Sequence, residues 1–117
     1  DFFITHPEDY ELDERYTKGA SITHNQSEAL KDADFVYIKN WSTYMDYGRI
    51  YCNDPKWMLT NDKLKLTNNA RVMHCLPVRR NVEVSDEILD GPNSIVTQQA
   101  ANRVWAAQAV LREILLK

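Results

Sequence analysis

The feature that most constrains the fold is a series of short β-rich runs, which alternate with polar, helix-forming stretches. These β-rich runs lie at 2–5, 21–24, 35–39, 70–75 and 94–97. Strands that alternate with helices favour a parallel sheet, because parallel strands are joined by long crossover connections. The sequence therefore predicts an α/β fold with an open, mostly parallel sheet and crossover helices.

Helix signals follow several of these runs. Asn25 is a good N-cap with Glu28 three residues later, which predicts a capping box and a helix to about residue 33. A short helix is expected from residue 60 or 61 to about 66, and another after Ser85. The last helix, at 98–116, is expected to dock on the sheet through a stripe at helical spacing: Val104, Ala107, Leu111, Ile114 and Leu115.

Residues 40–56 show no sustained period of a strand or a helix and are rich in aromatic side chains. Long loops inside a compact domain are usually functional or disordered, and this aromatic content argues against disorder. We expect a loop that either contacts a substrate or forms a hydrophobic lid or a subunit contact.

Composition limits the class of protein. A chain of 117 residues with 14 Lys and Arg, 17 Asp and Glu and a net charge of −3 can hold one core, and a broad electrostatic grip on nucleic acid or membrane is not expected. Cys52 and Cys75 are too few for a disulfide framework or a four-ligand zinc site, so we expect at least one free thiol.

With no signal peptide or membrane span, we expect a cytoplasmic protein. The first residues, an apolar run without an initiator Met, indicate part of a longer polypeptide.

Cations follow three of the predicted strands, at the edge where open parallel sheets bind ligands. Lys39 follows the third strand, Arg79 and Arg80 follow the fourth, and Arg103 follows the fifth. Four cations at one rim of an acidic protein predict an acidic small molecule as ligand. Gly is found at only three positions, which excludes a Gly-rich nucleotide-binding loop within these residues.

Each of these residues also has a purely structural interpretation. Lys39 could be a solvated charge at a strand end, and an Arg near a helix start often pairs with a carboxylate. His74 and Cys75 could be core residues. Because neighbours on a strand point to opposite faces, they do not form a nucleophile and base pair in regular strand geometry, which disfavours a cysteine protease.

One longer motif favours the functional interpretation. Residues 73–81 read Met-His-Cys-Leu-Pro-Val-Arg-Arg-Asn, and Ala-Asn-Arg follows at 101–103. This pattern resembles the carbamoyltransferase family, in which His-Cys-Leu-Pro is shared with ornithine carbamoyltransferases. The ornithine enzymes carry an Asp-containing Ser-Met-Gly motif where this sequence has Lys-Asn-Trp at 39–41. In this respect the sequence is similar to the branch that acts on N-acylated ornithine, and the stretches 4–7 and 67–70 fit that branch.

The resemblance implies an enzyme of two α/β domains, of which residues 1–117 would be part of the C-terminal, amino-acid-binding domain. The carbamoyl-phosphate-binding N-terminal domain would lie outside this chain, and the isolated chain would be inactive. The implied reaction transfers a carbamoyl group from carbamoyl phosphate to the δ-amine of N-acetylornithine or N-succinylornithine, in the cytoplasm, in arginine biosynthesis. The implied assembly is a homotrimer, with no metal, cofactor, nucleic acid or membrane.

The same resemblance implies roles for particular residues. Cys75 and Arg103 would be catalytic, with Arg103 near the carbamoyl oxygen where negative charge develops. The substrate-binding residues would be Lys39, His74, Leu76, Arg79 and Arg103. Lys39 and Arg79 would hold the α-carboxylate, the Leu76 carbonyl would lie beside the attacking amine, and the Leu76–Pro77 peptide bond would be cis. Glu83 stands where some acetylornithine enzymes carry Lys.

Two other functions stay open from the sequence. One is an ornithine carbamoyltransferase, against which the Lys-Asn-Trp stretch argues. The other is a non-catalytic α/β binding domain, against which the intact set of Cys75, Arg79 and Arg103 argues.

Overall fold

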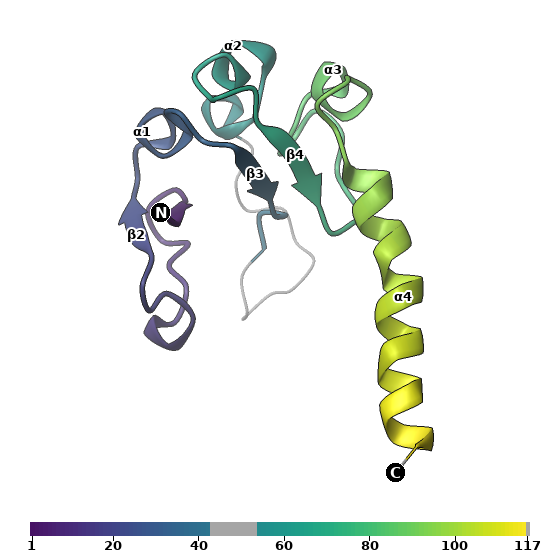
Figure 1. The fold of residues 1–117 in the computed structure, drawn as a ribbon. Helices are drawn as coiled ribbons and strands as arrows, with labels where there is room; N and C mark the ends of the chain where they lie inside the picture. The colour runs from purple at the N-terminus through teal and green to yellow at the C-terminus, as the bar shows by residue number, and fades with distance from the viewer. Residues whose placement is uncertain (43–53, 117) are drawn as a thin grey trace.

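The strands of this chain are parallel, as the alternation of elements predicts. The computed structural model describes residues 1–42 and 54–116. Its strands are β1 (Phe3–Thr5), β2 (Ser21–Thr23), β3 (Phe35–Ile38) and β4 (Arg71–His74). β1 pairs with β2 and β3 pairs with β4, each in parallel register, so the strands form two small sheets (Figure 1). The α/β class with parallel strands is therefore confirmed.

Short helices lie between these strands, and two further helices follow β4. The α-helices are α1 (Gln26–Leu30), α2 (Asn61–Leu64), α3 (Asp86–Leu89) and α4 (Val96–Leu115), and the 3-10 helices are η1 (Glu14–Tyr16) and η2 (Pro55–Trp57). The Asn25 side chain accepts a hydrogen bond from the Glu28 backbone N–H at 3.3 Å, which confirms the predicted N-cap. The second half of the predicted capping box, from the Asn25 N–H to the Glu28 carboxylate, is replaced by a bridge through Thr23. The Asn25 N–H donates to the Thr23 hydroxyl, and this hydroxyl donates to the Glu28 carboxylate.

The core gathers around β4. Val72 at its centre is fully buried, with β3 on one side of the strand. The buried cluster consists of Leu30, Leu59, Val72, Val84, Ile88, Leu89 and Val96. These residues come from β4, three of the helices and the segments beside them, so the core fixes the ends of β3 and β4 relative to α3 and the start of α4.

The fifth predicted strand, at 94–97, is wrong. Only a single parallel bridge forms there, between Val72 and Ser94. The Ile95 N–H donates to the Val72 carbonyl, and the Ile95 carbonyl then accepts from Gln99 N–H. Because the chain turns into α4 immediately after this bridge, no further residue can add to the ladder.

The predicted docking of the terminal helix on the sheet is also wrong for the described residues. Only Val96 of α4 is buried, and the apolar residues further along the helix are exposed, with Leu111 at 56% and Ile114 at 64%. A 20-residue helix is about 30 Å long, whereas a four-residue strand covers about 13 Å. α4 therefore runs far beyond the end of β4 (Figure 1). Among residues 1–42 and 54–116, no helix is both long and apolar enough to cross a membrane.

Candidate active site at the ends of β3 and β4

The first feature of the site is a contact between residues that follow two adjacent strands. Ile38 and His74 are register partners at the ends of β3 and β4, so Lys39 and Cys75 emerge at the same edge. The Lys39 Nζ donates to the Cys75 Sγ at 3.2 Å, and it lies 5.9 Å from the centre of the Tyr37 ring. The parallel register thus brings an ammonium group onto the only Cys of the described residues.

The surroundings of Cys75 favour its thiolate. Burial by itself raises the pKa of the thiol, but the hydrogen bond and charge of Lys39, with a smaller effect of Tyr37, outweigh burial and bring the pKa below its usual value. Cys75 forms no disulfide, which confirms the expected free thiol; Cys52 and most of the aromatic loop lie outside the described residues.

His74 is fully buried, and both of its ring nitrogens are engaged. Its Nδ1 accepts from the Leu76 N–H at 2.9 Å, so the Nε2 carries the proton and donates to the Asn40 Oδ1 at 3.0 Å. Burial, followed by repulsion from Lys39, lowers the pKa of His74. The structure therefore places His74 as a neutral group that holds the turn at Leu76 and the side chain of Asn40.

The turn after β4 has an unusual backbone. Leu76 has φ of 54°, in the left-handed region that non-glycine residues rarely occupy, and the Leu76–Pro77 peptide bond is cis. Asn40 crosses from the end of β3 and donates to the Pro77 carbonyl at 3.1 Å. The position of the Leu76 carbonyl is therefore set by His74 and Asn40 from two directions.

Arg103 reaches Cys75 from α4. Its guanidinium donates to the backbone carbonyl of Cys75 at 3.4 Å. Since the core fixes only the first turns of α4 against β4, Arg103 lies close to the part of the helix that the core positions. Lys39 and Arg103 thus contact Cys75, one at its sulfur and the other at its carbonyl.

Arg79 joins the site through a buried carboxylate. Its Nη1 lies 3.6 Å from the Glu83 Oε1, and the same oxygen accepts from the Trp41 N–H at 3.4 Å. The ring of Trp41 makes edge contacts with Tyr10 at 5.7 Å and Trp57 at 5.9 Å between ring centres. Arg79 is therefore linked to the residues that follow β3.

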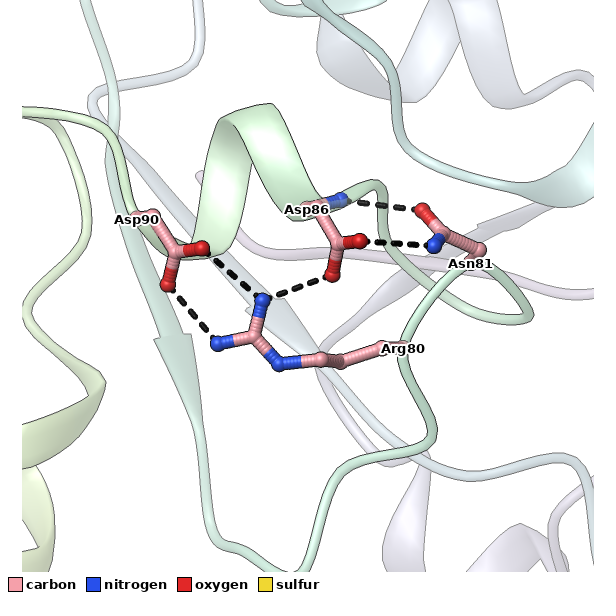
Figure 2. A network of polar contacts seen from close by, with 4 residues as sticks. All are labelled: Arg80, Asn81, Asp86 and Asp90. Carbon is pink, nitrogen blue, oxygen red and sulfur yellow. Dashed lines mark hydrogen bonds and ion pairs between the residues drawn. The ribbon is translucent and has the colours of Figure 1, made fainter.

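Arg80 does not belong with the other cations, contrary to the expected rim of four. Its guanidinium donates to Asp86 at 2.6 Å and to the two carboxylate oxygens of Asp90 at 2.9 and 2.7 Å (Figure 2). Asn81 accepts from the Asp86 N–H and donates to its carboxylate, so it caps α3 in place of the predicted Ser85 side chain. The network fixes the chain that follows Arg79 onto α3.

The structure thus brings together Lys39, Cys75 and Arg103 by direct contact, and it joins Arg79 through Glu83 to the backbone of Trp41, two residues after Lys39. Two hollows lie elsewhere. One of about 300 Å³ is beside the start of α1 and α2, and one of about 400 Å³ is around η1. Sequence reasoning missed the bridging role of Asn40, because its two contacts join segments more than 30 residues apart, and no short-range pattern encodes them.

Comparison with known proteins identifies the family. The profile of the aspartate/ornithine carbamoyltransferase Asp/Orn binding domain matches residues 3–114. The chain is 45% identical to the N-succinylornithine carbamoyltransferase of Bacteroides fragilis (strain 638R), over 98% of this chain and 37% of the relative. It is 34% identical to the N-acetylornithine carbamoyltransferase of Xylella fastidiosa (strain 9a5c), over 88% of this chain and 36% of the relative.

Solved structures agree with these relatives. A crystal structure of N-acetyl-L-ornithine transcarbamylase superposes with a TM-score of 0.80 at 32% identity, covering 95% of this chain and 39% of the other. The ornithine carbamoyltransferase from Pyrococcus furiosus gives a TM-score of 0.82 at 32% identity, covering 95% and 40%. This chain spans less than half the length of these relatives. It belongs to the aspartate/ornithine carbamoyltransferase family and corresponds to the family's Asp/Orn binding domain.

Proposed function

We propose that this chain is part of the C-terminal, amino-acid-binding domain of an enzyme that transfers a carbamoyl group from carbamoyl phosphate to the δ-amine of an N-acylated ornithine. The observation that carries the proposal is the convergence of Lys39 and Arg103 on Cys75, with Arg79 linked through Glu83. The relatives named N-succinylornithine and N-acetylornithine carbamoyltransferase support the same substrate class.

The charges of the site suit such a substrate. Acylation removes the positive charge of the α-amine and leaves the α-carboxylate, so the site needs cations and no carboxylate aimed at the α-nitrogen. Lys39 has three N–H donors and Arg79 has five, which allows each to hold a substrate carboxylate besides its contact within the protein. The planar fork of Arg79 suits a bidentate contact.

In the reaction, the neutral δ-amine attacks the carbonyl carbon of carbamoyl phosphate. A C–N bond forms, the C–O bond to phosphate breaks, and the proton that the amine loses passes to the departing phosphate, which gives N-acylcitrulline and phosphate. Negative charge collects on the carbamoyl oxygen in the tetrahedral transition state, where we place Arg103. Cys75 and the Leu76 carbonyl would orient the carbamoyl nitrogen and the attacking amine, and the buried, neutral His74 would hold the Leu76 turn in place.

The acyl group is the finer part of the proposal. The 45% identity to an N-succinylornithine enzyme exceeds the 34% identity to an N-acetylornithine enzyme, which favours the succinyl substrate. We also propose, from the family resemblance, a cytoplasmic homotrimer that acts in arginine biosynthesis.

Product formation by the complete enzyme tests this function. Carbamoyl phosphate is supplied with ornithine, N-acetylornithine or N-succinylornithine in separate assays, and the citrulline derivative is measured by mass spectrometry. We expect product from N-succinylornithine and little or none from ornithine. Product in the ornithine assay and in neither of the other two would assign an ornithine carbamoyltransferase. Binding of carbamoyl phosphate without product in any assay would assign a non-catalytic domain.

A further inference from the structure

Glu83 is a buried anion at the base of the candidate site. It is 1% exposed, and its carboxylate is fully buried. Ionised groups are seldom buried without a partner, because removal of a charge from water is costly unless an opposite charge and hydrogen bonds compensate it. Because this carboxylate is buried, it does not contribute to solubility. Its place between two segments of the site indicates another role.

The backbone of Glu83 is held firmly, so its carboxylate starts from a fixed point. The Glu83 carbonyl accepts from the Leu59 N–H at 2.9 Å, and the next residue, Val84, is fully buried in the core. Ser85 N–H donates to the Leu59 carbonyl, which continues this pairing. The Cα of Glu83 is thus anchored by the core, independently of the contacts that its carboxylate makes with Arg79 and Trp41.

One carboxylate oxygen joins two parts of the site. The Glu83 Oε1 lies 3.6 Å from the Arg79 Nη1 and accepts from the Trp41 N–H at 3.4 Å. Arg79 belongs to the segment that follows β4, and Trp41 belongs to the segment that follows β3. Within residues 1–42 and 54–116, the second oxygen, Oε2, is buried and accepts no hydrogen bond.

We propose that Glu83 is a positioning residue for substrate binding. It orients the guanidinium of Arg79 toward the substrate carboxylate and fixes the backbone at Trp41. This inference rests on the proposed function, in which Arg79 binds the α-carboxylate of the N-acylornithine. The ion pair at 3.6 Å is longer than a direct hydrogen bond, so Glu83 directs the guanidinium of Arg79 by charge.

The position of the anion explains why it acts on the amino-acid substrate and not on carbamoyl phosphate. Glu83 contacts neither Cys75 nor Arg103 by any hydrogen bond or ion pair of the described residues. Neutralisation of Glu83 is therefore expected to change the fit of the carboxylate at Arg79, while the groups at Cys75 keep their arrangement.

The test is steady-state kinetics of the complete enzyme with Glu83→Gln, which keeps the shape and removes the charge. We expect the KM for N-acylornithine to rise about tenfold, the size expected from a misaligned charge-assisted contact. The KM for carbamoyl phosphate should stay within about twofold of its original value. Glu83→Asp retains the charge on a shorter side chain, and its KM should lie between those of the wild type and Glu83→Gln.

Two further variants separate positioning from a general loss of stability. Glu87→Gln is the matched control, because Glu87 is exposed and accepts from Asn61 at 2.7 Å, away from the site; its KM values should not change. In the Arg79→Ala background, Glu83→Gln should add no further increase in KM, because the Gln amide oxygen can still accept from the Trp41 N–H and the lost charge acts on the substrate through Arg79.

The outcomes are decisive. No product from the wild type with any ornithine compound would overturn the proposed function and this inference with it. Turnover by the wild type together with an unchanged KM in Glu83→Gln, or equal changes in the KM of both substrates, would overturn the inference alone. Failure of both Glu83 variants to fold, judged by thermal melting, would assign Glu83 to stability and also overturn it.

Discussion

The Nζ of Lys39 lies 3.2 Å from the Sγ of Cys75, where the parallel strands β3 and β4 end side by side. The contact pairs a cation with the group that it helps to ionise, because Lys39 lowers the pKa of the thiol against the opposing effect of burial. Burial first, and the charge of the same ammonium second, lower the pKa of the neighbouring His74. One lysine therefore favours the charged form of one residue and the neutral form of the next.

The reactivity of Cys75 should depend on Lys39. In Lys39→Met, burial acts on the thiol without the opposing ammonium, so the pKa of Cys75 should rise and alkylation should need a higher pH. The measurement is the pH midpoint of iodoacetamide labelling, read by mass spectrometry on the Cys75 peptide so that Cys52 is followed separately. Lys31→Met, at an exposed lysine beside α1, is the control. An unshifted midpoint in Lys39→Met would contradict the pairing.

Arg79→Ala should weaken binding of the N-acylornithine. Loss of a charge-assisted contact costs about 1.5 to 3 kcal/mol, which corresponds to about a 10- to 100-fold increase in KM. The variant should also lower the thermal midpoint, because it leaves the buried Glu83 carboxylate without its cation, and Arg79→Ala with Glu83→Gln should recover part of that loss. Unchanged substrate affinity in Arg79→Ala would remove this residue from the site.

Arg103→Ala should lower turnover more than substrate affinity. Its proposed partner, the carbamoyl oxygen, becomes charged only in the transition state, so kcat should fall by about 100- to 1000-fold with little change in either KM. Steady-state kinetics with each substrate varied in turn will separate the two effects. A loss of affinity at an unchanged kcat is the result that this role does not allow.

The Arg80 network predicts acid sensitivity of the turn that carries Arg79. Hydrogen bonds from Arg80 are the main reason that the pKa values of Asp86 and Asp90 lie below their usual value of 3.8. A carboxyl with a lowered pKa in the folded state contributes stability above the unfolded pKa and loses it as the pH falls through the folded value.

Arg80→Met should therefore lower stability near neutral pH, modestly because these groups are largely exposed, and make stability fall less steeply below pH 3.8. Urea unfolding at a series of pH values measures both effects. Lys18→Met, at an exposed lysine remote in sequence from α3, is the control. If the acid dependence of Arg80→Met matched that of the wild type, the network would have no part in it.

Much of the fold can be predicted from the sequence where local signals decide it. The strands at 35–39 and 70–75 agree with β3 and β4 within one residue at each end, because both are short runs rich in large apolar residues. Asn25 caps α1 as expected, since an N-cap needs only its own side chain and a nearby N–H. The cis Leu76–Pro77 bond, implied by the family resemblance, is confirmed as well.

The errors occur where distant segments compete. The run at 94–97 is β-rich, yet it becomes one bridge and the start of α4, because the hydrogen bond of Gln99 N–H to Ile95 begins the helix there. The stripe on α4 has the spacing of a docking face, but the short strands end long before the helix does. Spacing along a helix cannot show how much sheet is available to cover it.

The sequence by itself determined the family, the α/β class and the edge at which the polar residues gather. The family follows from short motifs, and the edge follows because these residues come directly after predicted parallel strands. Only the tertiary structure decided the pairing of the cations: Lys39 and Arg103 contact Cys75, Arg79 faces Glu83, and Arg80 turns to Asp86 and Asp90. In the sequence, all four cations have the same description, a basic residue that follows a predicted strand. Their partners differ because the electrostatic and hydrogen-bond energy of each depends on which groups the folded backbone brings within a few ångströms.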